Sequence, residues 1–452
     1  MNHEKHQVMA AILEKARAVA DEAEIFNLES DSMSIGFRNG ILREMHEAQD
    51  SGCCLRIIKN HRIAHVTTSN MDRALDLVEQ ALLLVPFGET VSFSFPKPAV
   101  TAPDTTATPA ENRLDQMVED ARGIIESLIA YEPAMMPNSG SDITSLKVSI
   151  MNSNGVDRHY ETTVHSLSAV AILAEEGNIL STYRYHLGQD ACPDPQQIAR
   201  DVIELIRMGR NNVPFAGGHI PILMTPHAMA DIFAAFGAGI SGSAIAKGMS
   251  PLTGKLGHKL MNENISIVDD PLIPGATGTQ VIDDEGVACS RKFLIENGVL
   301  KNYLLDLNSA SKLNLEPTGN GFRYTPLIKN RSYAASPGPA FTNLLLPSGD
   351  QPYRDILSSA PRMLLIDQLT GVLLGNLING DWSGNIEYGI LFENGEPRGR
   401  IKNAMTGGNF YHMFNELYVE SSSERNWVSG FGGGAGSSLF PYVLFDGLTV
   451  SA

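Results

Sequence analysis

The sequence predicts an α+β protein in which an N-terminal α/β domain precedes a C-terminal, mainly antiparallel β domain with peripheral helices. Three observations support this fold class: apolar stripes of helical period in the first half, alternating apolar runs between them, and paired Asn-Gly turns in the second half. We place the N-terminal domain at 1–94, a Pro- and Thr-rich linker or crossing at 95–112, a helix–strand extension of the N-terminal part at 113–215, and the C-terminal β-rich domain at 216–452.

The first hundred residues predict two helices and two strand pairs. The helices follow from apolar residues at helical spacing: Met9, Ile12, Ala16 and Val19 in the first, and Leu75, Val78 and Leu82 in the second. Met33, Ile35 and Phe37 alternate before Asn39-Gly40, and this pattern predicts a hairpin because Asn-Gly favours the tight turns between antiparallel strands. The run LRIIKNHRIAHV predicts a second strand pair.

The segment at 95–112, FPKPAVTAPDTTATPAEN, has a composition that cannot form a helix or a central strand. The clearest amphipathic helix follows it, over 114–129. After further strand-like runs, Asp194 as N-cap and Pro195 at the first helical position mark the start of another helix. Its predicted buried stripe is Ile198, Val202 and Ile206.

From Gly217 onward, the chain becomes rich in strands and turns. The runs LIENGVLKNYLL and ILFENGEPRGRI each centre on Asn-Gly, so both predict hairpins, and Gly298 and Gly395 should lie in turns rather than helices. The closing run LFPYVLFDGLTV predicts a terminal strand.

Composition limits the classes of partner. The 34 Lys and Arg residues against 51 Asp and Glu give a formal net charge of −17, which disfavours binding to nucleic acid or to anionic membrane surfaces. No apolar stretch reaches the roughly 20 residues of a spanning helix. The charged N-terminus does not resemble a secretory signal, so we expect a cytoplasmic protein. The four cysteines form no CxxC pattern, and we expect adjacent Cys53 and Cys54 to be buried free thiols.

Histidines offer two weak metal-site patterns. His46-Glu47 begins like a zincin motif, but no second His follows at helical spacing, so exposed strand or turn residues are the better interpretation. His219 and His227 flank an apolar strand that contains two prolines, and only an unusual fold would bring both to one metal.

Other local patterns are equally unspecific. The acidic clusters Asp269-Asp270 and Asp283-Asp284-Glu285 could supply oxygen ligands, but their neighbours are turn formers, which favours solvated turn carboxylates. The run SGFGGGAGSS is followed by a strand-like segment, so a flexible or closely packed loop is favoured over a phosphate site. GISGSA, at 239–244, is not a nucleophile elbow. From the residues alone, no catalytic constellation emerges.

Several blocks after Gly217, in order, resemble the TldD/PmbA family, the modulator of DNA gyrase proteins, and within it the PmbA (TldE) branch. They are ISGSAIAKGMSPLTGKLG (240–257), ISIVDDPLIPGATGTQVIDDEGV (265–287), LIENGVLKNYLLDLNSASKL (294–313), PTGNG (317–321), TNLLLPSG (342–349), NGDWSGNIEYGILFENGE (379–396) and LFDGLTV (444–450). The first half is similar only in its helix–hairpin–helix pattern and its linker.

The resemblance implies a zinc peptidase system. In TldD-type chains a helix carries HExxxH, whose histidines bind zinc and whose Glu activates water, and a C-terminal Cys is thought to complete the site. Counting back from Lys255-Leu256-Gly257 places that motif on 233–238 of this chain, where Phe233 and Ala238 replace the histidines and Ala234 replaces the Glu. No cysteine follows Cys289. The resemblance therefore implies no catalytic residue, metal ligand or cofactor in this chain, with zinc expected in a TldD-type partner.

The same helix has an ordinary structural interpretation. Phe233, Phe236 and Ile240 have the spacing of a buried helix face. Three glycines, Gly237, Gly239 and Gly242, would each weaken a helix interior, so they suggest either close approach of a neighbouring backbone or an early helix end.

The leading hypothesis is a non-catalytic subunit of a TldD/TldE-type zinc metallopeptidase complex that acts on small or unfolded peptides. The family resemblance implies processing of a modified peptide-antibiotic precursor and turnover of an antitoxin, without showing which applies. Two alternatives stay open: an autonomous hydrolase with a site rebuilt from His219, His227 or the acids at 283–285, and a peptide-binding homodimer without chemistry.

The resemblance also implies that this chain contributes to the wall around a partner's metal site. That points to the glycine-rich loop and its surroundings as a partner- or peptide-binding region. Its candidate residues are Trp427, Phe431, Gly432, Gly433, Gly434 and Tyr442. The alternative is a loop that packs its aromatic residues into its own domain.

Overall fold

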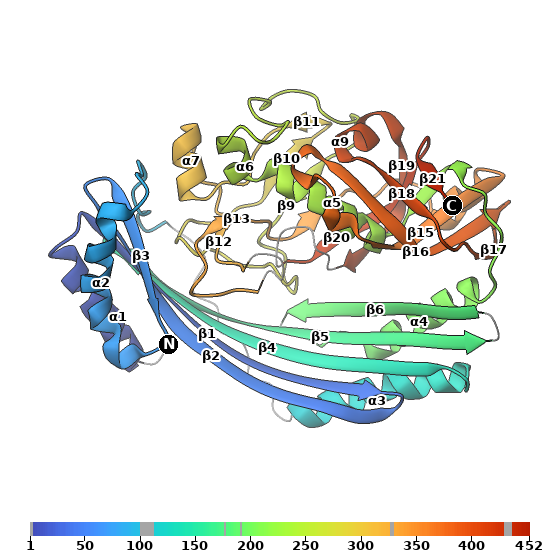
Figure 1. Ribbon diagram of the computed structural model, residues 1–452, viewed down its shortest axis with the longest axis horizontal. Coiled ribbons are helices and arrows are strands. Elements are labelled where there is room, and N and C mark those ends of the chain that lie inside the picture. The colour runs from blue at the N-terminus through green and yellow to red at the C-terminus, as the bar shows by residue number, and fades with distance from the viewer. Residues whose placement is uncertain (1–2, 100–112, 176–177, 190–191, 326–329, 429–435) are drawn as a thin grey trace.

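The computed structural model describes residues 3–99, 113–175, 178–189, 192–325, 330–428 and 436–452 (Figure 1). Most of the predicted linker, 100–112, and the loop residues Phe431 and Gly432 to Gly434 lie outside the described residues. Phe95 to Ala99, at the start of that linker, have no regular secondary structure, as their prolines predict.

The N-terminal half is a curved antiparallel sheet of six strands in the order β3-β2-β1-β4-β5-β6, which extends beneath the C-terminal half (Figure 1). The strands are β1 (Glu22–Arg38), β2 (Ile41–Lys59), β3 (Arg62–Thr68), β4 (Met136–Asn152), β5 (Asp157–Glu175) and β6 (Asn178–Gln189). The predicted α+β class is confirmed, but the N-terminal α/β layout is wrong. Within β1–β3 and within β4–β6, strands that follow one another in the chain pair antiparallel, as in hairpins, and β1 pairs antiparallel with β4, which lies far from it in sequence. Every strand pairing in this sheet among the described residues is therefore antiparallel.

Both predicted hairpins of the first hundred residues are confirmed. Asn39 and Gly40 join β1 to β2 with φ of 49° and 74°, the left-handed backbone that tight hairpin turns require. Asn60 and His61 join β2 to β3 with φ of 51° and 60°.

Helices pack on both ends of this sheet. Helix α1 (His3–Arg17) and helix α2 (Leu77–Leu84) cover one end, with Met9, Ile12 and Val78 in a shared core. Val19 lies beyond the end of α1 and is exposed, contrary to its predicted place in the stripe. The short helices η1 (Met71–Asp76) and η2 (Val85–Phe87) flank α2.

Helices α3 (Arg113–Tyr131) and α4 (Pro195–Gly209) pack against β5 and against each other. The predicted start of α4 is confirmed: the Asp194 side chain accepts a hydrogen bond from the Gln196 amide, and Pro195 occupies the first helical position. The predicted stripe of Ile198, Val202 and Ile206 is fully buried. Helix α4 therefore lies between the N-terminal sheet and the C-terminal half.

The C-terminal half contains a large curled sheet, mostly antiparallel but with two parallel pairings, β14 with β20 and β8 with β15. Its strands are β7 (Gly218–His219), β8 (Ile222–Met224), β9 (Ile267–Asp269), β10 (Lys292–Glu296), β11 (Val299–Leu300), β14 (Leu344–Leu345), β15 (Arg362–Thr370), β16 (Asp381–Glu393), β17 (Glu396–Arg400), β18 (Met405–Asn409), β19 (Tyr418–Val428), β20 (Ser438–Phe445) and β21 (Thr449–Ser451). A separate pair is formed by β12 (Gly321–Phe322) and β13 (Gly338–Pro339).

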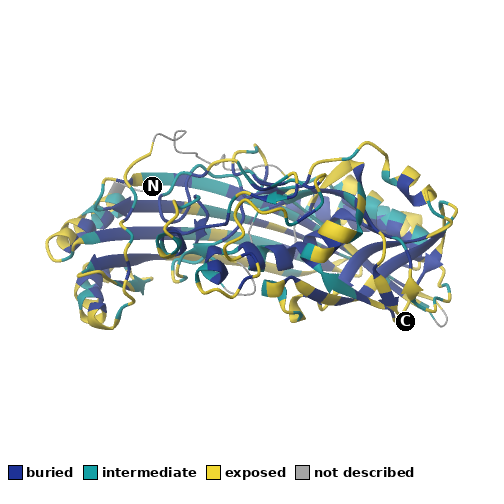
Figure 2. Cartoon of the chain, turned by 90° about the horizontal axis from the view of Figure 1, so that it is seen from above, coloured by how far each residue is buried: buried dark blue, intermediate teal, exposed yellow. Residues whose placement is uncertain are grey.

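The helical elements of this half are α5 (Pro226–Ile240), α6 (Gly242–Ala246), α7 (Leu307–Leu313), α8 (Tyr353–Ser358), α9 (Phe410–His412), η3 (Val372–Leu374), η4 (Leu377–Asn379) and the π-helical turn η5 (Met413–Leu417). The two predicted Asn-Gly hairpins are confirmed: Gly298 joins β10 to β11 and Gly395 joins β16 to β17, with φ of 77° and 78°. Buried residues run along the central strands of both halves (Figure 2). Among the described residues, no helix is long and apolar enough to cross a membrane.

Candidate functional site around helix α5

Helix α5 begins with a strong local signal. The Thr225 hydroxyl accepts a hydrogen bond from the Ala228 amide, and Pro226 supplies the first helical residue. The sequence that follows, PHAMADIFAAFGAGI, is apolar around most of its circumference. A helix of this kind is stable only inside a core, and α5 packs against β15 and β20, which flank β8 in the C-terminal sheet.

The positions at which the family resemblance places metal ligands are packed with apolar groups. Phe233 is 1% exposed, and its ring centroid lies 4.5 Å from that of Phe440, 5.0 Å from Phe410 and 5.7 Å from Phe414. Ala234 is buried and Ala238 is partly buried. None of these side chains offers a ligand atom, and the aromatic rings fill the space around Phe233, so these residues do not fit a zinc ion.

The predicted buried face of this helix is confirmed, because Phe233, Phe236 and Ile240 are each at most 1% exposed. For the glycines, the structure supports both proposed explanations. The helix ends at Ile240, and a Cβ built on Gly239 would lie 2.0 Å from the Tyr411 hydroxyl oxygen. A Cβ on Gly242 would lie 2.7 Å from the Leu304 carbonyl oxygen.

A cavity of about 470 Å³ lies beside the first turn of α5, between α4, β6 and β19. We call it the α4–β19 cavity. Trp427 and Tyr442, two of the residues predicted for the binding region, both line it. Trp427 is 39% exposed, whereas Tyr442 is partly buried and stacks on Tyr353 with ring centroids 4.3 Å apart. The cavity is further lined by Arg184, His186, Gln197, Asp201, Glu204, Leu205, Met208, Thr225, His227, Leu365, Asp367, Arg425 and Asn426.

An ion pair forms one wall of this cavity and joins the two halves of the chain. Arg184 of β6 donates two hydrogen bonds of 2.8 Å to the Asp367 carboxylate of β15. Burial alone would raise the pKa of Asp367, but the Arg184 guanidinium outweighs it and holds this pKa below its ordinary value. Both charges therefore persist in the interior because each is paired.

His227, at the second position of α5, lies beside this ion pair. Burial, reinforced by the charge of Arg184, lowers the pKa of His227 to about 3, so the imidazole is neutral at physiological pH. Its Nε2 atom is buried and has no hydrogen-bond partner among the described residues. Sequence reasoning singled out His227 for a metal site, but did not foresee that it shares a cavity with Trp427 and Tyr442.

The other histidine candidates lie elsewhere. His219 is exposed on β7, where its Nδ1 is 3.4 Å from the Thr449 hydroxyl oxygen. His46 and Glu47 are exposed on β2, as expected. Within the described ranges, no group of three or more His, Cys, Asp or Glu side chains is placed to hold a metal ion.

The prediction that the acidic clusters are solvated turn carboxylates is wrong for four of their residues. Asp269, Asp283, Asp284 and Glu285 are each at most 1% exposed, so they are not solvated turn carboxylates. They are buried because basic side chains and backbone amides distant in sequence satisfy them: Lys292 pairs with Asp269, Arg331 with Asp284 and Arg56 with Glu285, while Asp283 accepts from the Gly321 amide. Local turn-forming neighbours gave no sign of these partners.

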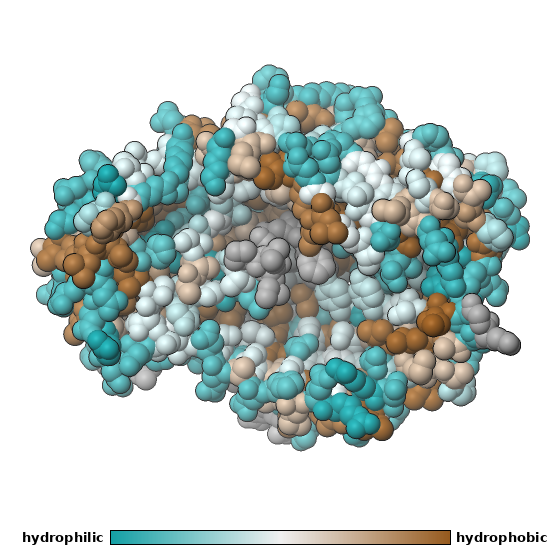
Figure 3. All heavy atoms as spheres, in the orientation of Figure 1, coloured by the Kyte–Doolittle hydropathy of each residue, from teal (hydrophilic) through white to brown (hydrophobic). Residues whose placement is uncertain are grey.

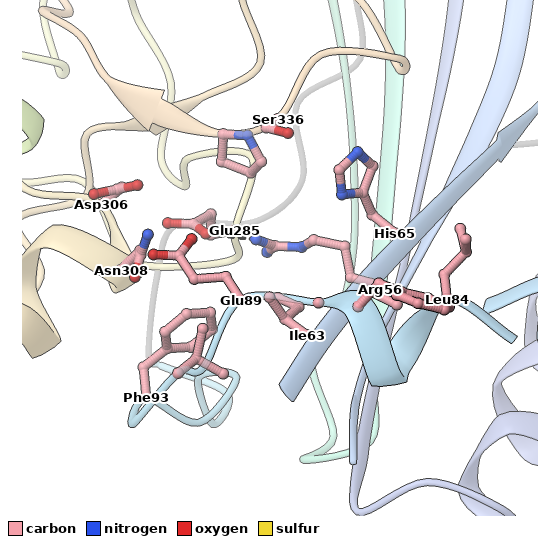
Figure 4. Close-up of a pocket in the computed structure, with 15 residues that line it drawn as sticks. Arg56, Ile63, His65, Leu84, Glu89, Phe93, Glu285, Asp306, Asn308 and Ser336 are labelled. Carbon is pink, nitrogen blue, oxygen red and sulfur yellow. Dashed lines mark hydrogen bonds and ion pairs between the residues drawn. The ribbon is translucent and has the colours of Figure 1, made fainter. Parts of the chain in front are cut away.

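Figure 4 shows a second cavity, of about 360 Å³, at the junction of the two halves. Arg56 extends toward Glu285, and Glu89, Asp306 and Asn308 lie around the same end of the cavity (Figure 4). Burial, opposed by the Arg56 charge, raises the pKa of Glu285 to about 7. Each of these charged groups already has a hydrogen-bond or ion-pair partner within the chain. These contacts therefore join the two halves of the chain, and we assign the cavity no ligand.

Comparison with known proteins identifies the family. The PmbA/TldA metallopeptidase C-terminal domain matches residues 217–452, domain 1 of that family matches 23–84, and its central domain matches 108–209. The metalloprotease PmbA of Escherichia coli O157:H7 is 23% identical over 429 residues, 91% of this chain and 90% of its own. The matches to the TldD homologues of Buchnera aphidicola and Haemophilus influenzae are shorter: they cover 53% and 48% of this chain, and 49% and 44% of those proteins.

Two solved structures share the whole fold. A putative modulator of DNA gyrase from Thermotoga maritima superposes with a TM-score of 0.86 at 26% identity, covering 99% of this chain and all of that one. TldE from Thermococcus kodakarensis gives a TM-score of 0.87 at 21% identity, covering 98% of this chain and all of that one. Together with the domain matches over most of its length, these likenesses show that the chain belongs to the PmbA/TldD metallopeptidase family.

Proposed function

We propose that this chain is the non-catalytic, PmbA/TldE-type subunit of a zinc metallopeptidase complex that acts on small or unfolded peptides. The observation that carries the proposal is the apolar packing of α5: a member of a metallopeptidase family holds Phe233, Ala234 and Ala238 where the family resemblance places two zinc ligands and a general base. In this view a TldD-type partner with an intact HExxxH supplies the zinc and the water chemistry.

The surface is compatible with a partner chain. Leu83 and Phe87, near the end of α2, are 73% and 86% exposed, and apolar residues gather at that end of the molecule in Figure 3. Exposed apolar patches of this kind are typical of interaction sites. Trp427, at the rim of the α4–β19 cavity, is a second exposed residue of a type enriched in interfaces.

An autonomous hydrolase built on the remaining histidines has weaker support. A general base works best with a pKa near the working pH, whereas that of His227 is about 3. His219 is exposed, whereas the acids at 283–285 are buried, where Asp284 and Glu285 form ion pairs and Asp283 accepts hydrogen bonds from backbone amides. A peptide-binding homodimer would differ from the leading proposal in two ways: its partner would be a second copy of this chain, and the assembly would have no hydrolytic activity.

The test uses the purified lone chain and its co-expression with an HExxxH-bearing family member. We expect less than stoichiometric zinc and no peptide turnover in the lone chain, and a stable heteromer that cleaves unfolded peptide substrates. Stoichiometric zinc together with turnover by the lone chain would contradict the proposal. A self-associating chain that ignores the family partner would favour the homodimer.

The place of docking is tested by changing Trp427 and Phe431 to Ala together. We expect loss of heteromer assembly while the melting temperature of the lone chain stays the same, because an interface aromatic contributes mainly to binding. A collapse of the lone chain's stability would show instead that these aromatic residues belong to the chain's own core, and unimpaired assembly would show that they lie outside the partner interface.

A further inference from the structure

A long stretch of β2 forms a border of the N-terminal sheet. Residues 41–52 pair with β1 on one side, whereas among the described residues the other side is free until β3 begins to pair with β2 at Cys53 (Figure 1). All of the residues 41–51 except Glu44 are exposed. The edge of such a strand presents backbone N–H and C=O groups to which another strand can hydrogen-bond.

Features that usually protect a sheet edge from pairing are scarce along this border. Proteins commonly place lysine, proline or a covering helix there, but the segment ILREMHEAQDSG, at 41–52, contains neither lysine nor proline. Helix α3 packs on Ile35 and Phe37 of β1. The residues opposite them on β2, Met45 and Leu42, are nevertheless 53% and 38% exposed. Apolar surface next to α3 is therefore left open to solvent.

The side chains of Arg43, Met45 and Glu47 form a self-complementary pattern on this face of β2. They are alternate residues of the strand, so they share a face in the order positive, apolar, negative. Neither charged residue has an ion-pair partner within the part of the chain that the structure describes. The two lie four residues apart, about 13 Å along a strand, which is too far for them to pair with each other.

A second copy of β2, running antiparallel, presents the same pattern in reverse. When Met45 lies opposite Met45 of the second copy, Arg43 of each chain faces Glu47 of the other, and twofold symmetry makes this contact twice. On the other face of the sheet, Glu44 then lies opposite His46 of the second copy. Opposite charges that face each other across two strands stabilise the pairing.

Other symmetric registers lose this complementarity. Facing residues must share a face of the sheet, so the twofold axis has to pass through a residue. An axis at Glu44, or at Glu47, sets that acid against its own copy, and an axis at Arg43 does the same with two cations. Within 41–52, only the axis at Met45 places Arg43 opposite an acidic residue.

We propose that β2 pairs antiparallel with β2 of a second copy of this chain, with Met45 at the twofold axis and Arg43 opposite Glu47, so that two N-terminal sheets form one continuous sheet. The segment 43–47 ends before Cys53, so β3 does not obstruct the pairing. Trp427 lies on β19 in the C-terminal half and stays available to the TldD-type partner. The inference does not depend on the proposed function.

The experiment measures the mass of the full chain in solution by sedimentation over a range of protein concentrations. We expect a reversible dimer with a Kd on the order of 10 µM, because an edge-to-edge contact is smaller than a standard interface. Arg43→Glu and Glu47→Arg each convert both Arg–Glu contacts into like-charge contacts. Each variant alone should therefore dimerise at least about tenfold more weakly than wild type.

An equimolar mixture of the two variants tests the register itself. In a mixed dimer every substituted residue faces the opposite charge again, so the mixture should dimerise about as well as wild type. Glu396→Arg reverses an exposed charge on β17 and is the matched control, which should leave dimerisation unchanged. Circular dichroism should show the same folded chain in all variants, because each change is at an exposed residue.

Two results would overturn the proposal. One is a wild-type chain that stays monomeric up to about 100 µM, a measurement that needs no variant. The other is a mixture of the two folded variants that dimerises no better than either variant alone. Neither result involves zinc or peptide cleavage, so failure of this inference is distinct from failure of the proposed function.

Discussion

Asp231 follows His227 by one helical turn on α5 and interacts with the same buried carboxylate, Asp367. Burial, with the negative charge of Asp367 as a second cause, raises the pKa of Asp231 to about 7 from an ordinary value near 4. The folded chain therefore keeps this proton through a pH range in which the unfolded chain has lost it. Stability contributed by Asp231 is present below about pH 4 and is lost as the pH rises toward 7.

Replacement of Asp231 by Asn should remove the loss of stability that ionisation of this carboxyl causes at high pH. Because part of the residue is exposed, the effect should be smaller than a pKa shift from about 4 to about 7 would give for a fully buried group. We expect Asp231→Asn to be more stable than wild type by about 1–2 kcal/mol at pH 8. The difference should shrink toward zero at pH 4. Chemical denaturation at both pH values measures it, and a difference independent of pH would show that this carboxyl does not titrate as described.

Single residues also show what the sequence could not reveal. The glycine that follows them made Asp283 and Glu285 look like solvated turn residues, yet Glu285 pairs with Arg56, a residue 229 positions away. In the same way, Trp427, Tyr442 and His227 come from three different elements, and no local pattern indicates that they line one cavity. Burial of charge and assembly of a cavity depend on tertiary contacts, which spacing along the chain does not encode.

At the scale of elements, local sequence was a better guide. Asn39-Gly40, Asn297-Gly298 and Asn394-Gly395 all form the predicted turns, because the left-handed backbone they adopt is a property of the turn itself. The helix at 114–129 and the capped start of α4 were equally predictable. The pairing of β1 with β4 was not, because these strands lie far apart in sequence and no local turn joins them.

The contact between α5 and α9 gives a prediction at this scale. Gly239→Ala would ordinarily strengthen a helix, by up to about 1 kcal/mol. Here the added Cβ would lie 2.0 Å from the Tyr411 hydroxyl oxygen, so the neighbour must shift. We expect Gly239→Ala to lower the free energy of unfolding by about 1–3 kcal/mol, the usual cost of overpacking a core.

The matched control removes the obstructing atom. The Tyr411 hydroxyl is buried and has no hydrogen-bond partner among the described residues, so Tyr411→Phe alone should cost little or even stabilise the chain. Without that oxygen the nearest ring carbon would be 3.3 Å from the new Cβ. The double variant should therefore recover most of the lost stability. If the two changes add independently in denaturation experiments, the steric explanation is wrong.

At the scale of the whole molecule, a buried charge network holds the curved N-terminal sheet against the C-terminal half. Arg56 of β2 donates to Glu24 of β1 at 2.8 and 2.6 Å and to Glu285 at 2.8 Å. Arg323, from the C-terminal half, donates to the same Glu24 at 3.0 Å. All four side chains are nearly inaccessible to solvent, with exposures of 6% or less.

Removing one member of such a network leaves buried charges without compensation. We expect Arg56→Met to lower the free energy of unfolding by about 3–5 kcal/mol, since Glu24 and Glu285 then lose their shared cation.

Arg38→Met is the matched control: Arg38 pairs with Glu44 on the same two strands, but the side chains are 67% and 43% exposed. That surface pair should contribute less than about 1 kcal/mol, because water and salt screen it. The measurement is the melting temperature of both variants at neutral pH, which should fall much further for Arg56→Met than for Arg38→Met. Equally small decreases in both variants would mean that apolar packing holds the two halves together and that the buried ion pairs contribute little.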